Sequence, residues 1–115
     1  MIIVTVNFSK EWPLDAFTIW PFIFIRPREQ VYGYDALIEH EKVHGRRQWK
    51  YLIVFWWLAY LLSWKFRYRE EIRAYRIQVA YDNGKQMSVN TAATLLATYY
   101  HVPVTREQAL IDLQS

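Results

Sequence analysis

The strongest limit on how this chain can fold comes from the motif His-Glu-x-x-His at residues 40–44. If this segment is helical, His40 and His44 lie one turn apart on the same face, because an α-helix has 3.6 residues per turn. Two imidazoles at this spacing can chelate one metal ion, and Glu41 lies on the flank of the same face. A metal site also needs a ligand from elsewhere in the chain, so a second segment must pack against this helix.

The composition limits the class of protein. A chain of 115 residues predicts one domain, with a β-rich segment at 1–33, a metal-binding helical core at 34–81 and C-terminal helices at 82–115. Hydrophobic residues make up 53% and aromatic residues 18%, which excludes a disordered chain. The absence of cysteine excludes disulfides and thiolate metal ligands. A net charge of +3 without a dense basic tract predicts no specific nucleic-acid partner.

Two β-branched and aromatic stretches precede the motif. Residues Ile2 to Phe8 predict a short strand, and Phe17 to Ile25 predict either an edge strand or two short strands, because Pro21 interrupts the run. We expect a small N-terminal antiparallel sheet, along whose edge an extended peptide could add a strand. The N-terminus lacks the pattern of a secretory signal, so the expected localisation is cytoplasmic, with membrane association left open.

Helices are predicted for the rest of the chain. The motif helix has Asp35 as its expected N-cap, and Gly45 marks its end, a bend, or the close approach of another backbone. Further helices are expected at Phe66–Tyr81, whose apolar stripe is Tyr68, Ile72, Tyr75 and Val79, at Ser88–His101 with Ser88 as N-cap, and at Thr105–Leu113 after a capping-box signature. The expected fold class is therefore α+β, mainly helical, with four to five helices after the sheet.

The segment from Tyr51 to Trp64 contains fourteen residues without a charge, between Lys50 and Lys65. A helix that spans a bilayer needs roughly 20 apolar residues, so this segment is short for that purpose. Aromatic residues and lysines at both ends are, however, typical of membrane interfaces. Two interpretations stay open: a helix buried in the protein core, or a helix that is embedded in or lies on a membrane.

The third metal ligand is expected to be a carboxylate, because the chain has no cysteine and only one further histidine, His101. On the Phe66–Tyr81 helix, Glu71 lies at the border of the apolar stripe, whereas Glu70 points away from it and is expected in solvent. His101 is a weaker candidate, since it lies at a helix end where a capping or packing role is common.

These residues resemble a known family. His40-Glu41-x-x-His44, followed by Glu71 with Ala74 three residues later, is similar to the gluzincin zinc metallopeptidases, and most similar to minimal single-domain gluzincin-like proteins. The resemblance implies a zincin-like active-site helix and Glu71 as third ligand. Many gluzincins have an aspartate after the alanine, where this chain has Tyr75. The hydrogen-bond acceptor for the ligand histidines is then a backbone carbonyl or one of three acidic residues, Asp35, Glu39 and Asp82.

The predicted function is that of a zinc metallopeptidase with one Zn²⁺ per chain, held by His40, His44 and Glu71, and a peptide or protein substrate. Glu41 would act as general base towards a zinc-bound water. Candidate donors to the oxyanion are Tyr75, Tyr68 and His101. Two alternatives stay open: a zinc-stabilised interaction protein without catalysis, and a membrane-associated accessory protein in which the motif is incidental.

Overall fold

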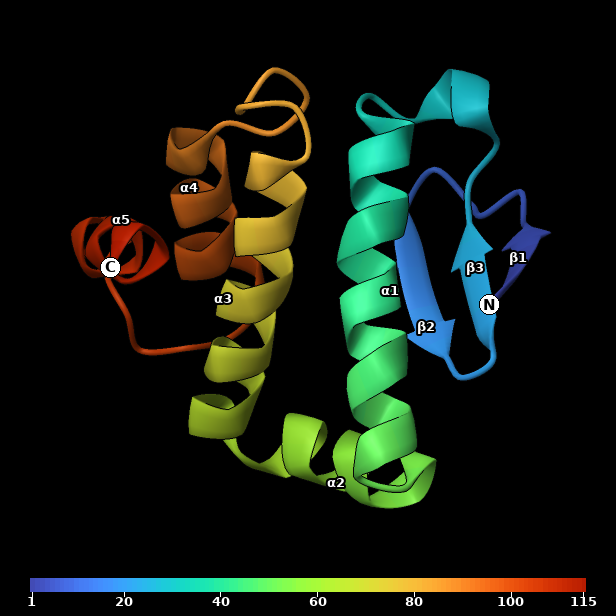
Figure 1. Ribbon diagram of the computed structural model, residues 1–115, viewed down its shortest axis with the longest axis horizontal. Helices are drawn as coiled ribbons and strands as arrows, with labels where there is room; N and C mark the ends of the chain where they lie inside the picture. The colour runs from blue at the N-terminus through green and yellow to red at the C-terminus, as the bar shows by residue number, and fades with distance from the viewer.

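The structure is a computed structural model that describes residues 1–115, and it has an α+β, mainly helical fold with a small N-terminal sheet, as predicted. The sheet lies on one side of helix α1, and α3, α4 and α5 lie on the other (Figure 1). Helix α2 lies across the ends of α1 and α3. The elements are β1 (Ile2–Thr5), β2 (Ala16–Ile19), β3 (Phe22–Ile25), the 3₁₀ helix η1 (Arg28–Gln30), α1 (Tyr34–Lys50), α2 (Ile53–Leu62), α3 (Trp64–Ala80), α4 (Val89–Tyr99) and α5 (Arg106–Gln114).

The second apolar run forms two strands, which confirms the break predicted at Pro21. Strands β2 and β3 are antiparallel, with Ala16 opposite Ile25, and their turn contains Trp20 and Pro21. Ile23 and Ile25 are fully buried and pack with Ile38 of α1, which fixes the sheet against that helix. Strand β2 is an edge strand, because the order in the sheet is β1-β3-β2.

The prediction of a purely antiparallel sheet was wrong for β1. This strand pairs with β3 in parallel, and it ends at Thr5 rather than Phe8. The reason is the connection at residues 6–15, which crosses from β1 at one edge of the sheet to β2 at the other edge while staying at the end where Ile25 lies. Strand β2 therefore runs opposite to β1, and β3, which is antiparallel to β2, runs in the same direction as β1. The guanidinium group of Arg26, which is largely buried, holds this connection by donating to the carbonyl oxygens of Phe8, Ser9 and Trp12.

The predicted N-cap of α1 was also wrong. The N-cap is Gly33, in the left-handed conformation with φ 73°, and no side chain caps the helix. A glycine adopts this conformation without strain, so the chain can enter α1 sharply from η1. Asp35 lies in the first turn, where a negative charge is favourable, and pairs with Arg28 at 3.1 Å.

Helix α1 continues through Gly45 to Lys50, so this glycine is neither the end of the helix nor its breaking point. A Cβ atom at Gly45 would lie 2.3 Å from Sδ of Met1 and 3.5 Å from Cγ2 of Thr18. What approaches Gly45 is the side chain of Met1. The interpretation that came nearest, the close approach of another backbone, was therefore wrong about the kind of neighbour.

The helices after α2 form a second core. The predicted stripe on α3 packs against α4 and α5, where Ile72 and Tyr75 contact the fully buried Leu96. Ser88 caps α4 by accepting from the N–H of Thr91, as predicted. Thr105 likewise caps α5, but the Gln108 side chain donates to Asp112 instead of completing the capping box.

Helix α2 does not fit the interpretation as a helix buried in the core. Of its ten residues only Trp56 is buried, because α2 covers α1 and α3 with one face and presents the other outward. None of the helices combines the length and the apolarity needed to cross a bilayer. The outer face carries five exposed apolar side chains: Val54, Phe55, Leu58, Leu61 and Leu62.

Candidate metal centre

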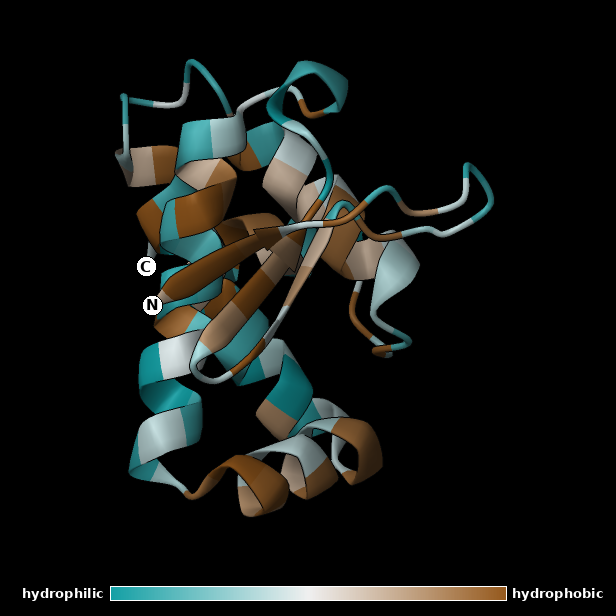
Figure 2. Cartoon of the chain, turned by 90° about the vertical axis from the view of Figure 1, so that its right-hand side faces the viewer, coloured by the Kyte–Doolittle hydropathy of each residue, from teal (hydrophilic) through white to brown (hydrophobic).

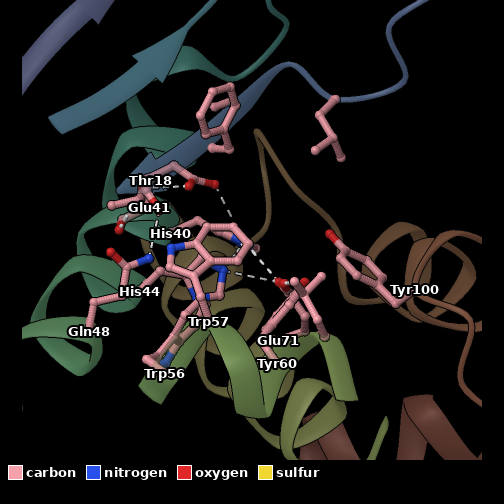
Figure 3. Close-up of a pocket in the computed structure, with 14 residues that line it drawn as sticks. Thr18, His40, Glu41, His44, Gln48, Trp56, Trp57, Tyr60, Glu71 and Tyr100 are labelled. Carbon is pink, nitrogen blue, oxygen red and sulfur yellow. Dashed lines mark hydrogen bonds and ion pairs between the residues drawn. The ribbon is translucent and has the colours of Figure 1, made fainter. Parts of the chain in front are cut away.

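The structure brings together the three predicted metal ligands. His40 and His44 project from α1, and Glu71 projects from α3 towards them (Figure 3). All three side chains are buried, with at most 6% of any of these residues exposed. Each pair among His40 Nε2, His44 Nε2 and Glu71 Oε1 is 3.2 Å apart. The group can therefore hold a metal ion.

The spacing of these atoms fits the geometry of a tetrahedral ion. Ligand atoms at about 2.0 to 2.1 Å from zinc, with tetrahedral angles between them, lie roughly 3.3 Å from one another. The observed triangle of 3.2 Å sides matches one face of such a tetrahedron. Three protein ligands then leave the fourth position to a water or a substrate.

A buried amide fixes the tautomer of His40. Its Nδ1 lies 2.7 Å from Oε1 of Gln78, and an amide oxygen can only accept, so Nδ1 carries the proton. In this tautomer Nε2 is the ring nitrogen that points into the centre of the triangle, towards Glu71 Oε1, and it is therefore the atom of His40 that could ligate a metal ion.

Gln78 was not among the predicted acceptors for the ligand histidines. The three acidic candidates are engaged elsewhere: Asp35 pairs with Arg28, Glu39 with Lys42, and Asp82 accepts from the N–H groups of Lys85 and Gln86. Gln78 lies seven residues after Glu71 on α3, which places both side chains on one face of the helix, two turns apart. That spacing is the signal from which Gln78 could have been found.

The ring of His44 is held differently. Its Nδ1 is buried and has no hydrogen-bond partner. The ring packs instead between aromatic side chains of α2, with its centroid 5.5 Å from Trp56 and 6.4 Å from Tyr60. Helix α2 therefore orients this ligand through packing.

The charges of the group depend on one another. Burial alone would lower the pKa of His44, but the adjacent Glu71 carboxylate overrides this effect and raises the pKa to about 9. Burial alone would raise the pKa of Glu71, but the two imidazoles hold it well below its usual range. Without a metal, the site therefore holds a protonated His44 beside an ionised Glu71. A metal ion would replace that proton, so its binding releases one.

Glu41 lies beside the triangle and is not part of it. Its Oε1 accepts a hydrogen bond of 2.6 Å from Oγ1 of Thr18, and its Oε2 is 3.9 Å from His40 Nε2 (Figure 3). Gln48 ties α1 to β2 by accepting from the N–H of Trp20 and donating to the carbonyl of Thr18. Strand β2 thus orients the Glu41 carboxylate, a role for Thr18 that the sequence analysis missed.

Three tyrosines surround the three candidate ligands, and one of them, Tyr75, was among the predicted donors to the oxyanion. Tyr75 packs edge-on against His40, with ring centroids 4.5 Å apart, and its hydroxyl is 2.7 Å from that of Tyr100. The Tyr60 hydroxyl donates to Oε2 of Glu71. Burial and the Glu71 carboxylate raise the pKa of all three phenols, so each stays protonated at neutral pH. Tyr60 and Tyr100 were missed because they lie outside α1 and α3.

The other two predicted donors lie away from the site. The hydroxyl of Tyr68 donates to Asp112 of α5. His101 is exposed, and its backbone is in the left-handed region with φ 53°. Neither residue lines the two cavities beside the metal ligands.

The prediction that Glu70 lies in solvent was wrong. Only 2% of this residue is exposed, because α1 and α2 cover this side of α3. Its carboxylate accepts from Trp56 Nε1 at 2.6 Å and from Arg47 Nε at 3.1 Å, and it pairs with Arg73. The helical wheel of α3 alone could not reveal Trp56 and Arg47 as partners, since they come from α2 and α1.

Two cavities of about 250 and 260 Å³ meet at the site, and both are lined by His40, Glu41 and Tyr100. The first also has Phe17 and the α2 residues Trp57 and Leu61 in its wall, so it is largely apolar. The second is more polar and includes Asp15, Tyr32 and Gln78. His40, His44 and Glu71 thus border the first cavity, and His40 borders the second as well.

No protein-family model, curated protein or solved structure matches this chain. The functional interpretation therefore depends on the geometry of the site.

Proposed function

We propose that this protein is a zinc-dependent peptidase in which Glu41 is the general base. The observation that carries the proposal is the combination of three converging ligand atoms with a fourth polar group, Glu41, that does not ligate but faces the same cavity. This is the arrangement that the resemblance to gluzincins implies. Membership of that family is part of the proposal.

Zinc is the proposed ion because of the donor set. Two neutral imidazoles and one carboxylate suit zinc, whereas magnesium and calcium prefer oxygen ligands alone. The 3.2 Å spacing of the donors supports a small tetrahedral ion. One ion per chain is expected.

The chemistry proposed is the hydrolysis of a peptide bond. When bound, zinc would lower the pKa of a water molecule that it ligates and would polarise the substrate carbonyl. Glu41 takes a proton from the water as its oxygen attacks the carbonyl carbon, and passes that proton to the leaving nitrogen as the C–N bond breaks. The products are a carboxylic acid and an amine, and transfer of the acid's remaining proton to the amine gives a carboxylate and an ammonium group. Thr18 holds the Glu41 carboxylate in position, and the hydroxyls of Tyr75 and Tyr100 are the candidate donors to the oxyanion.

An enzyme is favoured over a zinc-stabilised interaction protein by the number of ligands. Structural zinc sites have four protein ligands and are closed, whereas catalytic sites have three and keep one position open. Here three ligands converge, and they border cavities. The apolar wall of the first cavity and the adjacent edge strand β2 favour an extended peptide with a large apolar side chain near the bond that is cleaved.

The test is hydrolysis by the zinc-loaded full chain of a diverse peptide mixture, followed by mass spectrometry. We expect new cleavage products from the wild-type protein and a loss of at least 100-fold in rate for Glu41→Gln, which keeps the ligands. The matched control is Glu39→Gln, which changes a glutamate of α1 that pairs only with Lys42 and should retain full activity.

Zinc content is measured in each protein. Stoichiometric zinc with no cleavage by the wild type, or with equal cleavage by Glu41→Gln, would replace the peptidase proposal with the structural role of zinc. Absence of stoichiometric zinc would overturn the metal site itself.

A further inference from the structure

Helix α2 leaves a continuous apolar surface uncovered. The exposed residues Val54, Phe55, Leu58, Leu61 and Leu62 follow the spacing i, i+1, i+4, i+7 and i+8, which places them on one face of the helix. Between half and four fifths of each residue is exposed, from 49% for Leu58 to 83% for Leu62. The helix lies at one end of the molecule as a predominantly apolar segment (Figure 2). A contiguous patch of this kind marks a contact surface.

The exposed charges that flank α2 in the sequence all have one sign. Residues 42–69 contain seven basic side chains and no acidic one. Lys50 and Lys65 flank the helix at its two ends, and Arg46 and Arg69 lie about one turn further along α1 and α3. All four are exposed, and none of them forms an ion pair within the chain. The surface around the apolar face is therefore positive.

Aromatic residues stand at the same boundary. Trp49 and Tyr51 precede α2, and Trp64 follows it. All three are exposed, and the ammonium groups of Lys50 and Lys65 lie over the rings of Tyr51 and Trp64. Exposed aromatic rings next to lysines, around an apolar face, are typical of segments that lie at the boundary between lipid tails and headgroups.

We propose that α2 docks this protein onto an anionic membrane surface, lying in the plane of the interface with its outer face among the acyl chains. A helix of ten residues is about 15 Å long, half the thickness of the hydrocarbon core, so it suits a position along the surface. The basic residues at its ends would bind anionic headgroups. A second copy of the chain is a poorer occupant, because pairing two α2 faces would bring their lysines together.

This docking has a consequence for the cavity beside the metal ligands. Trp56, Trp57, Tyr60 and Leu61 of α2 line that cavity. A membrane bound to the outer face of α2 would therefore lie one helix away from the site, so the inferred substrates are peptide segments close to a membrane surface. This last step rests on the proposed peptidase function, whereas the docking itself does not.

The experiment is flotation of the full chain with vesicles of phosphatidylcholine containing 30% phosphatidylglycerol, and with vesicles of phosphatidylcholine alone. We expect the anionic vesicles to bind at least tenfold more tightly at low salt, with binding weakened at 0.5 M salt. The double variant Leu58→Glu/Leu62→Glu should lose at least tenfold in vesicle affinity. Ile111→Glu, a matched change of an exposed apolar residue on α5, should bind as the wild type does.

Circular dichroism and metal content show whether each variant is folded. A second variant, Lys50→Glu/Lys65→Glu, leaves the apolar face intact and should remove the preference for anionic vesicles. Failure of the wild type to float, or equal flotation of all variants, would overturn the proposal. So would a wild-type dimer without lipid that Leu58→Glu/Leu62→Glu converts to a monomer. None of these outcomes depends on peptide hydrolysis, so a failed docking and a failed peptidase proposal are distinguishable.

Discussion

Gln78 sets the tautomer and orientation of His40 without being one of the proposed metal ligands. Its side-chain oxygen accepts from Nδ1 of His40 at 2.7 Å, and only 3% of the residue is exposed. This bond places a proton on Nδ1 of His40 and directs Nε2 into the ligand triangle. Partners of this kind fix ring orientation and make the imidazole a better ligand.

Replacing Gln78 with leucine should weaken the proposed zinc binding by about 10- to 100-fold, because His40 loses its acceptor and can adopt the wrong tautomer. Gln78→Glu keeps an acceptor at the same place and should retain most of the affinity. Competition with a chromophoric chelator measures both. Equal affinities for Gln78→Leu and the wild type would show that packing alone orients His40.

The site could be predicted from the sequence where it depends on a single helix. The spacing of His40 and His44 is a property of α1 alone, and the position of Glu71 at the edge of a stripe is a property of α3 alone. Thr18 and Gln78 were missed and Glu70 was placed wrongly, because their roles depend on which elements face each other. Packing between helices also provides the partners that make a buried carboxylate such as Glu70 stable.

At the scale of elements, Glu70 joins three helices. It lies on α3, and its carboxylate binds Arg47 of α1 and Trp56 of α2. Glu70→Ala should lower the free energy of unfolding by about 3 kcal/mol, since it leaves a partly buried guanidinium and an indole N–H without their acceptor.

Urea denaturation of the zinc-loaded proteins measures this loss. Glu39→Ala, which removes an ion pair at the surface, is the control and should change stability by less than about 0.5 kcal/mol. A similarly small change in stability for Glu70→Ala would mean that water can replace the carboxylate as the hydrogen-bond acceptor for Arg47 and Trp56.

Most elements were predictable, and their arrangement was not. Local signals such as Ser88, Thr105 and the break at Pro21 identified helix starts and the two strands of the hairpin. The direction of β1 was wrong because nothing within β1 encodes it: the buried Arg26 and the path of residues 6–15 decide it. The exposure of α2 was likewise hidden, since a uniformly apolar segment does not reveal which of its faces is covered.

At the scale of the whole molecule, the ligands connect two parts with separate cores. The sheet packs against α1 through Ile23, Ile25 and Ile38, whereas α3, α4 and α5 share the core around Leu96. His40 and His44 belong to the first part and Glu71 to the second. A metal ion would therefore link the two parts directly.

If the group binds zinc as proposed, removal of the ion should lower the stability of the entire fold. A ligand present at 1,000 times its dissociation constant adds about 4 kcal/mol, which for a chain of this size corresponds to a shift in Tm of roughly 15 °C. Calorimetry with and without a chelator measures this shift. His44→Ala should melt at the same temperature in both conditions, and an unchanged Tm for the wild-type protein would contradict the prediction.

The hydrogen bond from Tyr60 to Glu71 connects the outer surface of the molecule with its interior. Tyr60 belongs to α2, so the helix with the exposed apolar face also holds a metal ligand. A binding event that moves Tyr60 relative to Glu71 should then change the affinity of the proposed site for an ion. Thermodynamic reciprocity requires the converse: the ion must change the affinity of α2 for its surface by the same factor. Ion binding and binding of the outer face of α2 would then be coupled, so a change in one would change the other.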